Sequence, residues 1–96
     1  MCSDFYAIKS DKERQSIETE LPRELATGHP LFGLPLTAIY RRNDDDDVLF
    51  QVNDGSGRVA EVHLTWRGDM EKLPWPISRF FESFDDWKKT NRRAEL

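Results

Sequence analysis

Four residues of chemically versatile types recur at every second position in the second half of the chain. Glu61, His63 and Thr65 alternate with apolar residues, and Arg67 continues the same parity. Side chains two positions apart on a strand project from one face, so these groups should share a surface. A carboxylate, an imidazole, a hydroxyl and a guanidinium could together bind a small anion or support acid–base chemistry. Such neighbours lie about 7 Å apart, too far for a direct catalytic pair, so we favour the polar outer face of a one-sided sheet.

A run of four acidic residues is the second concentration of charge, consisting of Asp44, Asp45, Asp46 and Asp47. It could bind calcium or offer an acidic knob to a basic partner. The spacing is not that of an EF-hand loop, because Gly55 stands where such a loop has its glutamate. We therefore expect a solvated turn, with recognition by a basic protein as its functional interpretation.

One tryptophan is a candidate recognition residue. Trp75 lies between Pro74 and Pro76, and both prolines restrict the backbone around it. A partly exposed tryptophan held rigidly is a suitable interface anchor. Packing onto the core is nevertheless the default expectation for this side chain, as it is for the other aromatic residues of the C-terminal third.

His29 follows the first predicted helix and could act as a ligand or a pH sensor. We favour a structural role, in which the ring bonds the last helical carbonyls. A zinc site made of His29, His63 and a carboxylate has no supporting local spacing. We predict no metal, no cofactor and no catalytic residue, because the sequence contains no phosphate loop, nucleophile elbow or Cys–His pair.

Composition limits the classes of protein to which the chain can belong. The 96 residues are enough for one domain, 1–96. The net charge of −4 argues against a nucleic-acid binder. The single cysteine, Cys2, favours a reducing cytoplasm. Met1–Lys12 lacks the apolar core of a signal peptide, and no apolar run is long enough to span a membrane.

The N-terminal elements are predicted from caps and apolar spacing. We expect residues 1–10 to be flexible and residues 11–28 to be helical, beginning with a capping box at Ser10 and presenting an apolar stripe. Pro22 should break or kink this helix near Glu20–Leu21, and Gly28 should cap it.

The rest of the chain predicts a sheet followed by a helix. Residues 36–66 read as a β-meander with strands Leu36–Arg42, Val48–Asn53 and Arg58–Trp66. Asn53–Gly57 should form the tight turn between the last two strands, because Asn/Asp-Gly suits positive φ, and Leu64 and Trp66 should share the buried side of the last strand. Residues 67–82 should form an irregular loop rich in proline and tryptophan, and residues 83–93 a helix capped by Ser83. The predicted fold is α+β: a three-stranded antiparallel meander, with the kinked N-terminal helix and the short C-terminal helix packed on one face.

Several segments resemble a small bacterial family of uncharacterised α+β proteins. They are GHPL at 28–31, DDVLF at 46–50, VHLTW at 62–66 and SFDDW at 83–87. The resemblance covers about residues 17–90. It implies a compact α+β fold and a bacterial cytoplasm, and it implies no activity, cofactor or catalytic residue.

The functional expectation is a non-enzymatic protein-binding module, for instance an inhibitor or immunity-type protein that binds a basic partner. An acidic protein would meet such a partner faster. The alternative is a small-ligand-binding protein or minor enzyme that uses the face of Glu61, His63 and Thr65. A homodimer through the first or third predicted strand, both of which would be free edges, is compatible with either function.

Overall fold

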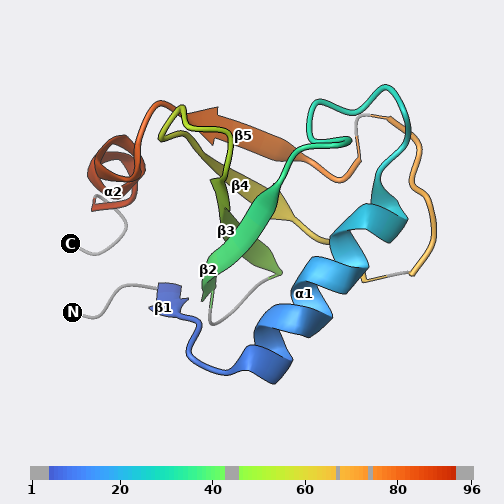
Figure 1. Cartoon of the computed structure of the whole chain (residues 1–96), viewed down its shortest axis with the longest axis horizontal. Helices are drawn as coiled ribbons and strands as arrows, with labels where there is room; N and C mark the ends of the chain where they lie inside the picture. Colours follow the sequence, from blue (N-terminus) through green and yellow to red (C-terminus); the bar gives the residue numbers. More distant parts are fainter. Residues whose placement is uncertain (1–4, 43–45, 67, 74, 93–96) are drawn as a thin grey trace.

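The chain folds into two helices and a five-stranded antiparallel sheet, and the α+β class is as predicted. The computed structural model describes residues 5–42, 46–66, 68–73 and 75–92 (Figure 1). In chain order the elements are β1 (Phe5–Ala7), α1 (Asp11–Glu24), β2 (Leu36–Arg42), β3 (Asp47–Val52), β4 (Val59–His63), β5 (Ser78–Phe81) and α2 (Phe84–Arg92). The strands pair in their sequence order, β1-β2-β3-β4-β5.

The predicted three-stranded meander is the centre of this wider sheet. β1 pairs with β2 from Tyr40 to Arg42, and β5 pairs with β4. Both added strands are short, and they lie in the segments predicted as flexible (1–10) and irregular (67–82). Three or four residues carry too little alternation for a sequence pattern to reveal a strand. The first and third predicted strands are therefore not both free edges, and the outer strands are β1 and β5.

The two helices cover opposite faces of the sheet, so the prediction that they share one face is wrong. Ile17 and Leu21 of α1 belong to one buried cluster together with Phe50 of β3. Trp87 of α2 belongs to a second cluster together with Leu49 of β3. Leu49 and Phe50 are adjacent in β3 and therefore point to opposite faces of the sheet. The face that was expected to be exposed to solvent is thus partly covered by α2.

The start of α1 follows its predicted cap only in part. The Oγ of Ser10 accepts a hydrogen bond from the Glu13 N–H at 3.3 Å. The Glu13 carboxylate does not turn back to close a capping box. It accepts hydrogen bonds from the Tyr6 hydroxyl and from the Arg41 guanidinium instead, and so connects the first turn of α1 to β1 and β2.

The end of α1 differs from the prediction. The helix continues through Pro22 and ends at Glu24, with Leu25 as its cap, so a break before Pro22 and a helix to residue 28 are both wrong. Pro22 is exposed and lies in the last turn. Leu21 and Leu25 are buried on either side of it, and this apolar burial offsets the backbone hydrogen bond that proline cannot make.

The third predicted strand is shorter than its alternating pattern suggests. β4 ends at His63, and Leu64 is the last residue of the alternation to be buried. Trp66 was expected to point inward with Leu64, but it is exposed. Its φ of 58° lies in the left-handed region, and the chain leaves the sheet here instead of continuing it.

Two local signals are confirmed. The segment Asn53–Gly57 connects β3 to β4 as a tight turn, in which Gly55 and Gly57 have φ of 84° and 80°. α2 follows Ser83, whose Oγ accepts a hydrogen bond from the Asp86 N–H at 3.1 Å. Glycine suits positive φ and serine suits a helix N-cap, so these features depend on only a few neighbouring residues.

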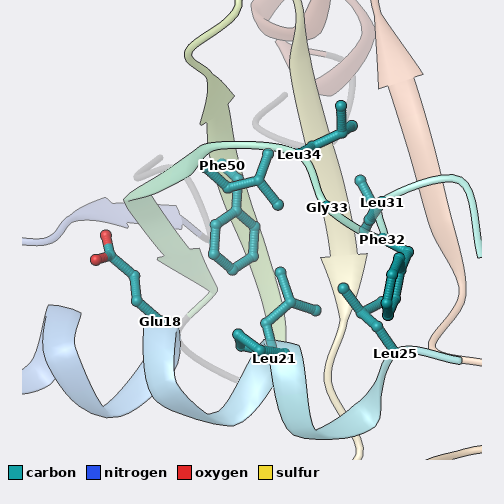
Figure 2. A pocket seen from close by; sticks show the side chains of 10 residues that line it. Glu18, Leu21, Leu25, Leu31, Phe32, Gly33, Leu34 and Phe50 are labelled. Carbon is teal, nitrogen blue, oxygen red and sulfur yellow. The ribbon is translucent and has the colours of Figure 1, made fainter. Parts of the chain in front are cut away.

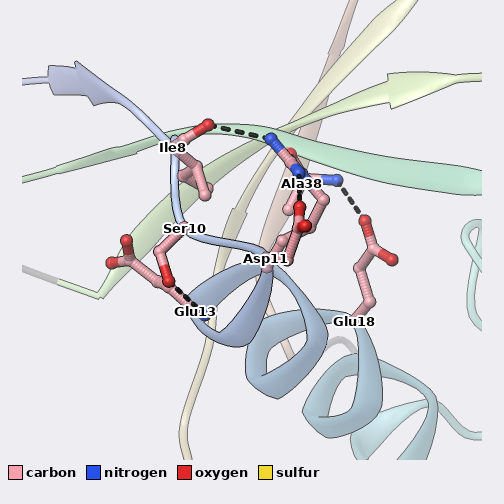
Figure 3. A network of polar contacts seen from close by, with 7 residues as sticks. Ile8, Ser10, Asp11, Glu13, Glu18 and Ala38 are labelled. Atoms are coloured by element: carbon pink, nitrogen blue, oxygen red, sulfur yellow. Dashed lines mark hydrogen bonds and ion pairs between the residues drawn. The ribbon is translucent and has the colours of Figure 1, made fainter.

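Side chains of α1 close the part of β2 that β1 does not reach (Figure 3). The Glu18 Oε2 accepts a hydrogen bond from the Ala38 N–H at 2.9 Å. The Arg14 Nε donates to the Ala38 carbonyl at 3.1 Å, and another Arg14 nitrogen donates to the Ile8 carbonyl at 2.8 Å. Polar contacts at the rim therefore fix α1 on the sheet in addition to its buried apolar stripe.

Candidate functional site

The predicted polar row on β4 exists, but its members bind different neighbours. Glu61 and His63 point to the face covered by α2, and the Glu61 Oε1 accepts a hydrogen bond from the Trp87 Nε1 at 2.9 Å. The His63 Nδ1 lies 2.8 Å from the Asp47 Oδ1, on the paired strand β3. The carboxylate and the imidazole are therefore directed to separate partners rather than to a common point.

The other two members of the row lie beyond the strand. The Thr65 hydroxyl donates a hydrogen bond to the Glu71 Oε2 at 2.7 Å, within the loop that follows β4. Arg67 lies outside the described residues. The structure thus brings Glu61 and His63 onto one face and places Thr65 in a different environment.

The acidic run is only partly described, since Asp44 and Asp45 lie outside the described residues. The Asp46 carbonyl accepts a hydrogen bond from the Leu64 N–H at 3.1 Å. Asp47 is the first residue of β3, and its half-buried carboxylate also lies 3.5 Å from the Arg42 guanidinium. Asp47 is thus part of the sheet and its ion pairs, and it does not belong to a solvated turn.

Sequence reasoning missed a pair of buried acidic residues, Glu20 and Glu24, on the inner face of α1. Glu24 is fully buried and Glu20 is 5% exposed. The two Glu24 oxygens accept hydrogen bonds from the N–H groups of Thr65 and Trp66, both at 3.0 Å. The Glu20 Oε2 accepts one from the Gly68 N–H at 2.9 Å. The pair therefore binds the backbone of the turn that follows β4.

The pKa of Glu24 is raised from 4.5 to about 7. Burial is the main cause, because it disfavours the charged form, and the hydrogen bond that the protonated Glu24 carboxyl donates to Glu20 raises the pKa further. The bonds from Thr65 and Trp66 act in the opposite direction. The sequence did contain a signal for the burial of this pair. Glu20 and Glu24 follow Ile17 by three and seven positions, and residues at this spacing lie on the same helical face.

The loop from Thr65 to Ile77 is held at several further points along its length. The Glu71 N–H donates to the Glu24 carbonyl at 3.0 Å, and the Trp75 N–H donates to the Lys72 carbonyl at 2.9 Å. The Ile77 carbonyl accepts a hydrogen bond from the His63 N–H at 2.9 Å. These bonds restrict the conformations of the loop, although little of it is regular structure.

His29 connects this loop to the segment after α1. Its ring is buried, the Nε2 donates to the Pro76 carbonyl at 2.7 Å, and the Nδ1 accepts from the Leu31 N–H at 3.1 Å. This arrangement requires a neutral ring with its hydrogen on Nε2. The predicted structural role is thus present, but the ring bonds Leu31 and Pro76 and not the last carbonyls of the helix.

Exposed large apolar side chains gather in two segments of the described chain. They are Phe32, Trp66, Met70, Leu73, Trp75 and Ile77. We call this set the apolar end. Figure 1 shows the two segments that carry it beside each other, next to the C-terminal end of α1. A side-chain carbon of Leu73 would lie only 3.1 Å from a Cβ added at Gly28, so the segments are in close contact.

Trp75 is the member of the apolar end that the sequence predicted. Its side chain is 43% exposed, and its ring centroid lies 6.4 Å from that of His63. A groove of about 640 Å³ adjoins it, lined by Thr65, Met70, Glu71, Lys72 and Trp75. The predicted recognition residue is therefore accessible and borders a concave surface.

Comparison with protein-family models, curated proteins and solved structures finds no match to this chain. The family resemblance drawn from short segments therefore stays a prediction. Within the described ranges, no group of three or more His, Cys, Asp or Glu side chains is placed to hold a metal ion. None of the described helices is long and apolar enough to cross a membrane.

Proposed function

We propose that this chain is a non-enzymatic protein-binding module that binds its partner through the apolar end. One observation carries the proposal: all the large apolar side chains that are exposed among the described residues lie in two adjacent segments. Scattered exposed apolar residues need no explanation, but large exposed apolar patches are typical of interaction surfaces, and the two segments meet where Leu73 approaches Gly28. Tryptophan is also among the residues that most often dominate the affinity of an interface.

The hydrogen bonds of the loop support this proposal. A loop that is already ordered loses little conformational entropy when a partner binds, so more of the contact energy appears as affinity. Glu24, Glu20 and His29 supply such order from outside the loop. Trp66 has a positive φ, which is uncommon for a bulky residue. Strained conformations of this kind are concentrated at functional sites.

We further propose a basic partner and a cytoplasmic location. The net charge of −4 would accelerate the encounter with a cationic protein at low salt. An inhibitor or immunity-type protein fits this combination. The alternative, a ligand or substrate on the face of Glu61, His63 and Thr65, has less support because the side chains of Glu61 and Thr65 bind Trp87 and Glu71.

The test is affinity capture from the source-cell lysate with a matched pair of variants. The double variant Leu73→Ser/Trp75→Ser removes two side chains of the apolar end. The control, Lys88→Ser/Lys89→Ser, changes two exposed residues of α2. Circular dichroism establishes that both variants are folded.

We expect wild type and control to retain the same protein and the apolar variant to lose it, with a roughly thirty-fold weaker affinity if Trp75 is a dominant contact. For a basic partner, capture should decline as salt is raised. Equal capture by all three proteins would refute the proposed surface, and so would a lysate from which wild type retains nothing above background.

A further inference from the structure

A second concave surface lies between α1, the segment that follows it, and the sheet (Figure 2). Its volume is about 390 Å³, which is within the usual range for small-molecule sites. We call it the α1 groove. Apart from Glu18 its lining is apolar, and consists of Leu21, Pro22, Leu25, Leu31, Phe32, Gly33, Leu34, Leu36 and Phe50.

The walls of the α1 groove are fixed by bonds that do not involve a ligand. The Phe32 N–H donates to the His29 carbonyl at 3.0 Å, and the Leu34 N–H donates to the Leu31 carbonyl at 3.1 Å. Gly33 turns the chain with a φ of 81°. Leu31 is fully buried and secures this segment to the core. The groove is therefore formed in advance, as most small-molecule sites are.

Glu18 is the one charged residue in the lining. Its Oε2 accepts the Ala38 N–H, and its other oxygen has no hydrogen-bond partner among the described residues. Figure 2 shows the carboxylate at the rim of the groove, on one side of the apolar residues. The nearby Arg14 guanidinium is paired with Asp11 at 3.1 Å, so the net charge of these three side chains is negative.

We propose that the α1 groove binds a small amphipathic cation, with an aliphatic or aromatic body and an ammonium group. The body would cover the lining side chains that keep exposed surface, Phe32, Leu34 and Leu36, where removal of apolar surface from water supplies the affinity. The ammonium group would donate to the free Glu18 oxygen. A carboxylate in the same place would be repelled, so the groove should select cations over anions of equal length.

The probes are octylamine, octanol and octanoate, used at neutral pH and below their aggregation concentrations. Isothermal titration calorimetry gives the affinity, and amide chemical shifts of Gly33 and Leu34 locate the binding. Octylamine should bind most tightly, up to roughly fivefold above octanol, because a half-exposed ion pair contributes up to about 1 kcal/mol. Octanoate should bind most weakly.

The variant Glu18→Gln provides the decisive comparison. Its amide oxygen can still accept the Ala38 N–H, so the fold should be retained while the charge is removed. The matched control Glu82→Gln removes an exposed carboxylate that does not line the groove. We expect Glu18→Gln to bind octylamine and octanol with similar affinity, and Glu82→Gln to keep the wild-type preference.

Three outcomes would overturn the proposal. They are equal binding of the three probes by wild type, a preference that survives Glu18→Gln, and no shift of the groove amides at millimolar probe concentration. The result is separable from the proposed function, because Glu18→Gln leaves every residue of the apolar end unchanged.

Discussion

The buried pair Glu20 and Glu24 leads to a specific prediction about pH. Folding raises the pKa of Glu24 from 4.5 to about 7, chiefly through burial and then through the hydrogen bond that the protonated carboxyl donates to Glu20. The folded protein therefore binds this proton more tightly than the unfolded chain does. The stabilisation that Glu24 contributes should be fully present below pH 4.5 and should be lost as the pH rises through about 7. At about 1.4 kcal/mol for each pKa unit, the loss approaches about 3 kcal/mol.

In the variant Glu20→Gln, Glu24 no longer has to be protonated to form a hydrogen bond with residue 20. The amide oxygen can keep the bond from the Gly68 N–H, and the amide N–H₂ can donate to the Glu24 carboxylate where the shared proton was. Like-charge repulsion within the pair disappears, while the burial of Glu24 remains. The fall in unfolding free energy should therefore be smaller than in wild type by about 1 kcal/mol or more.

The assay is urea unfolding monitored by circular dichroism, from pH 4.5 to about pH 8. All other titratable groups are present in wild type and variant alike, so the difference between the two pH profiles isolates the pair. The exposed control Glu82→Gln should retain the wild-type profile. A Glu20→Gln profile as steep as that of wild type would show that Glu20 does not raise the Glu24 pKa.

Three further stability predictions use the same urea assay at constant pH. His29→Ala should lower the free energy of unfolding by about 2–4 kcal/mol, because the Leu31 N–H and the Pro76 carbonyl lose their partner inside the core. A decrease below about 1 kcal/mol would contradict the structural role of the ring. Trp87→Phe should cost about 1–3 kcal/mol, since the Glu61 carboxylate loses its indole donor, and the penalty should shrink when Glu61→Leu is present as well. Gly55→Ala should cost about 1–2 kcal/mol through backbone strain alone, because a Cβ there meets no atom within 4 Å while φ is 84°; an unchanged midpoint would exclude that strain.

Features that depend on a few neighbouring residues could be predicted from the sequence. The caps at Ser10 and Ser83 and the tight turn before β4 are examples. β1 and β5 could not be predicted, because such short strands are specified by the strands they pair with. The run Val48-Leu49-Phe50, buried throughout, did carry a signal that was not used: consecutive apolar residues in a strand indicate that both faces are covered.

The candidate site also combines features that could be predicted from the sequence with features that could not. The sequence singled out Trp75 because prolines flank it, but it did not establish that the side chain would be exposed. The rest of the apolar end depends on where the loop after β4 leaves the sheet, and this is determined by Glu20 and Glu24 from a distant helix. Acidic side chains on an otherwise apolar helical stripe are ordinarily assigned to solvent. Only the tertiary structure shows that backbone N–H groups surround them.

The contacts that Arg14 and Glu18 make with Ala38 also bear on aggregation. An unpaired strand edge is a template on which a strand from another molecule can add, and repeated addition leads to amyloid-like assemblies. On the side of β2 away from β3, β1 reaches only Tyr40–Arg42, and these two charged side chains occupy the N–H and the carbonyl of Ala38 that an incoming strand would need. We therefore expect α1 to hinder the addition of a strand at this part of the β2 edge.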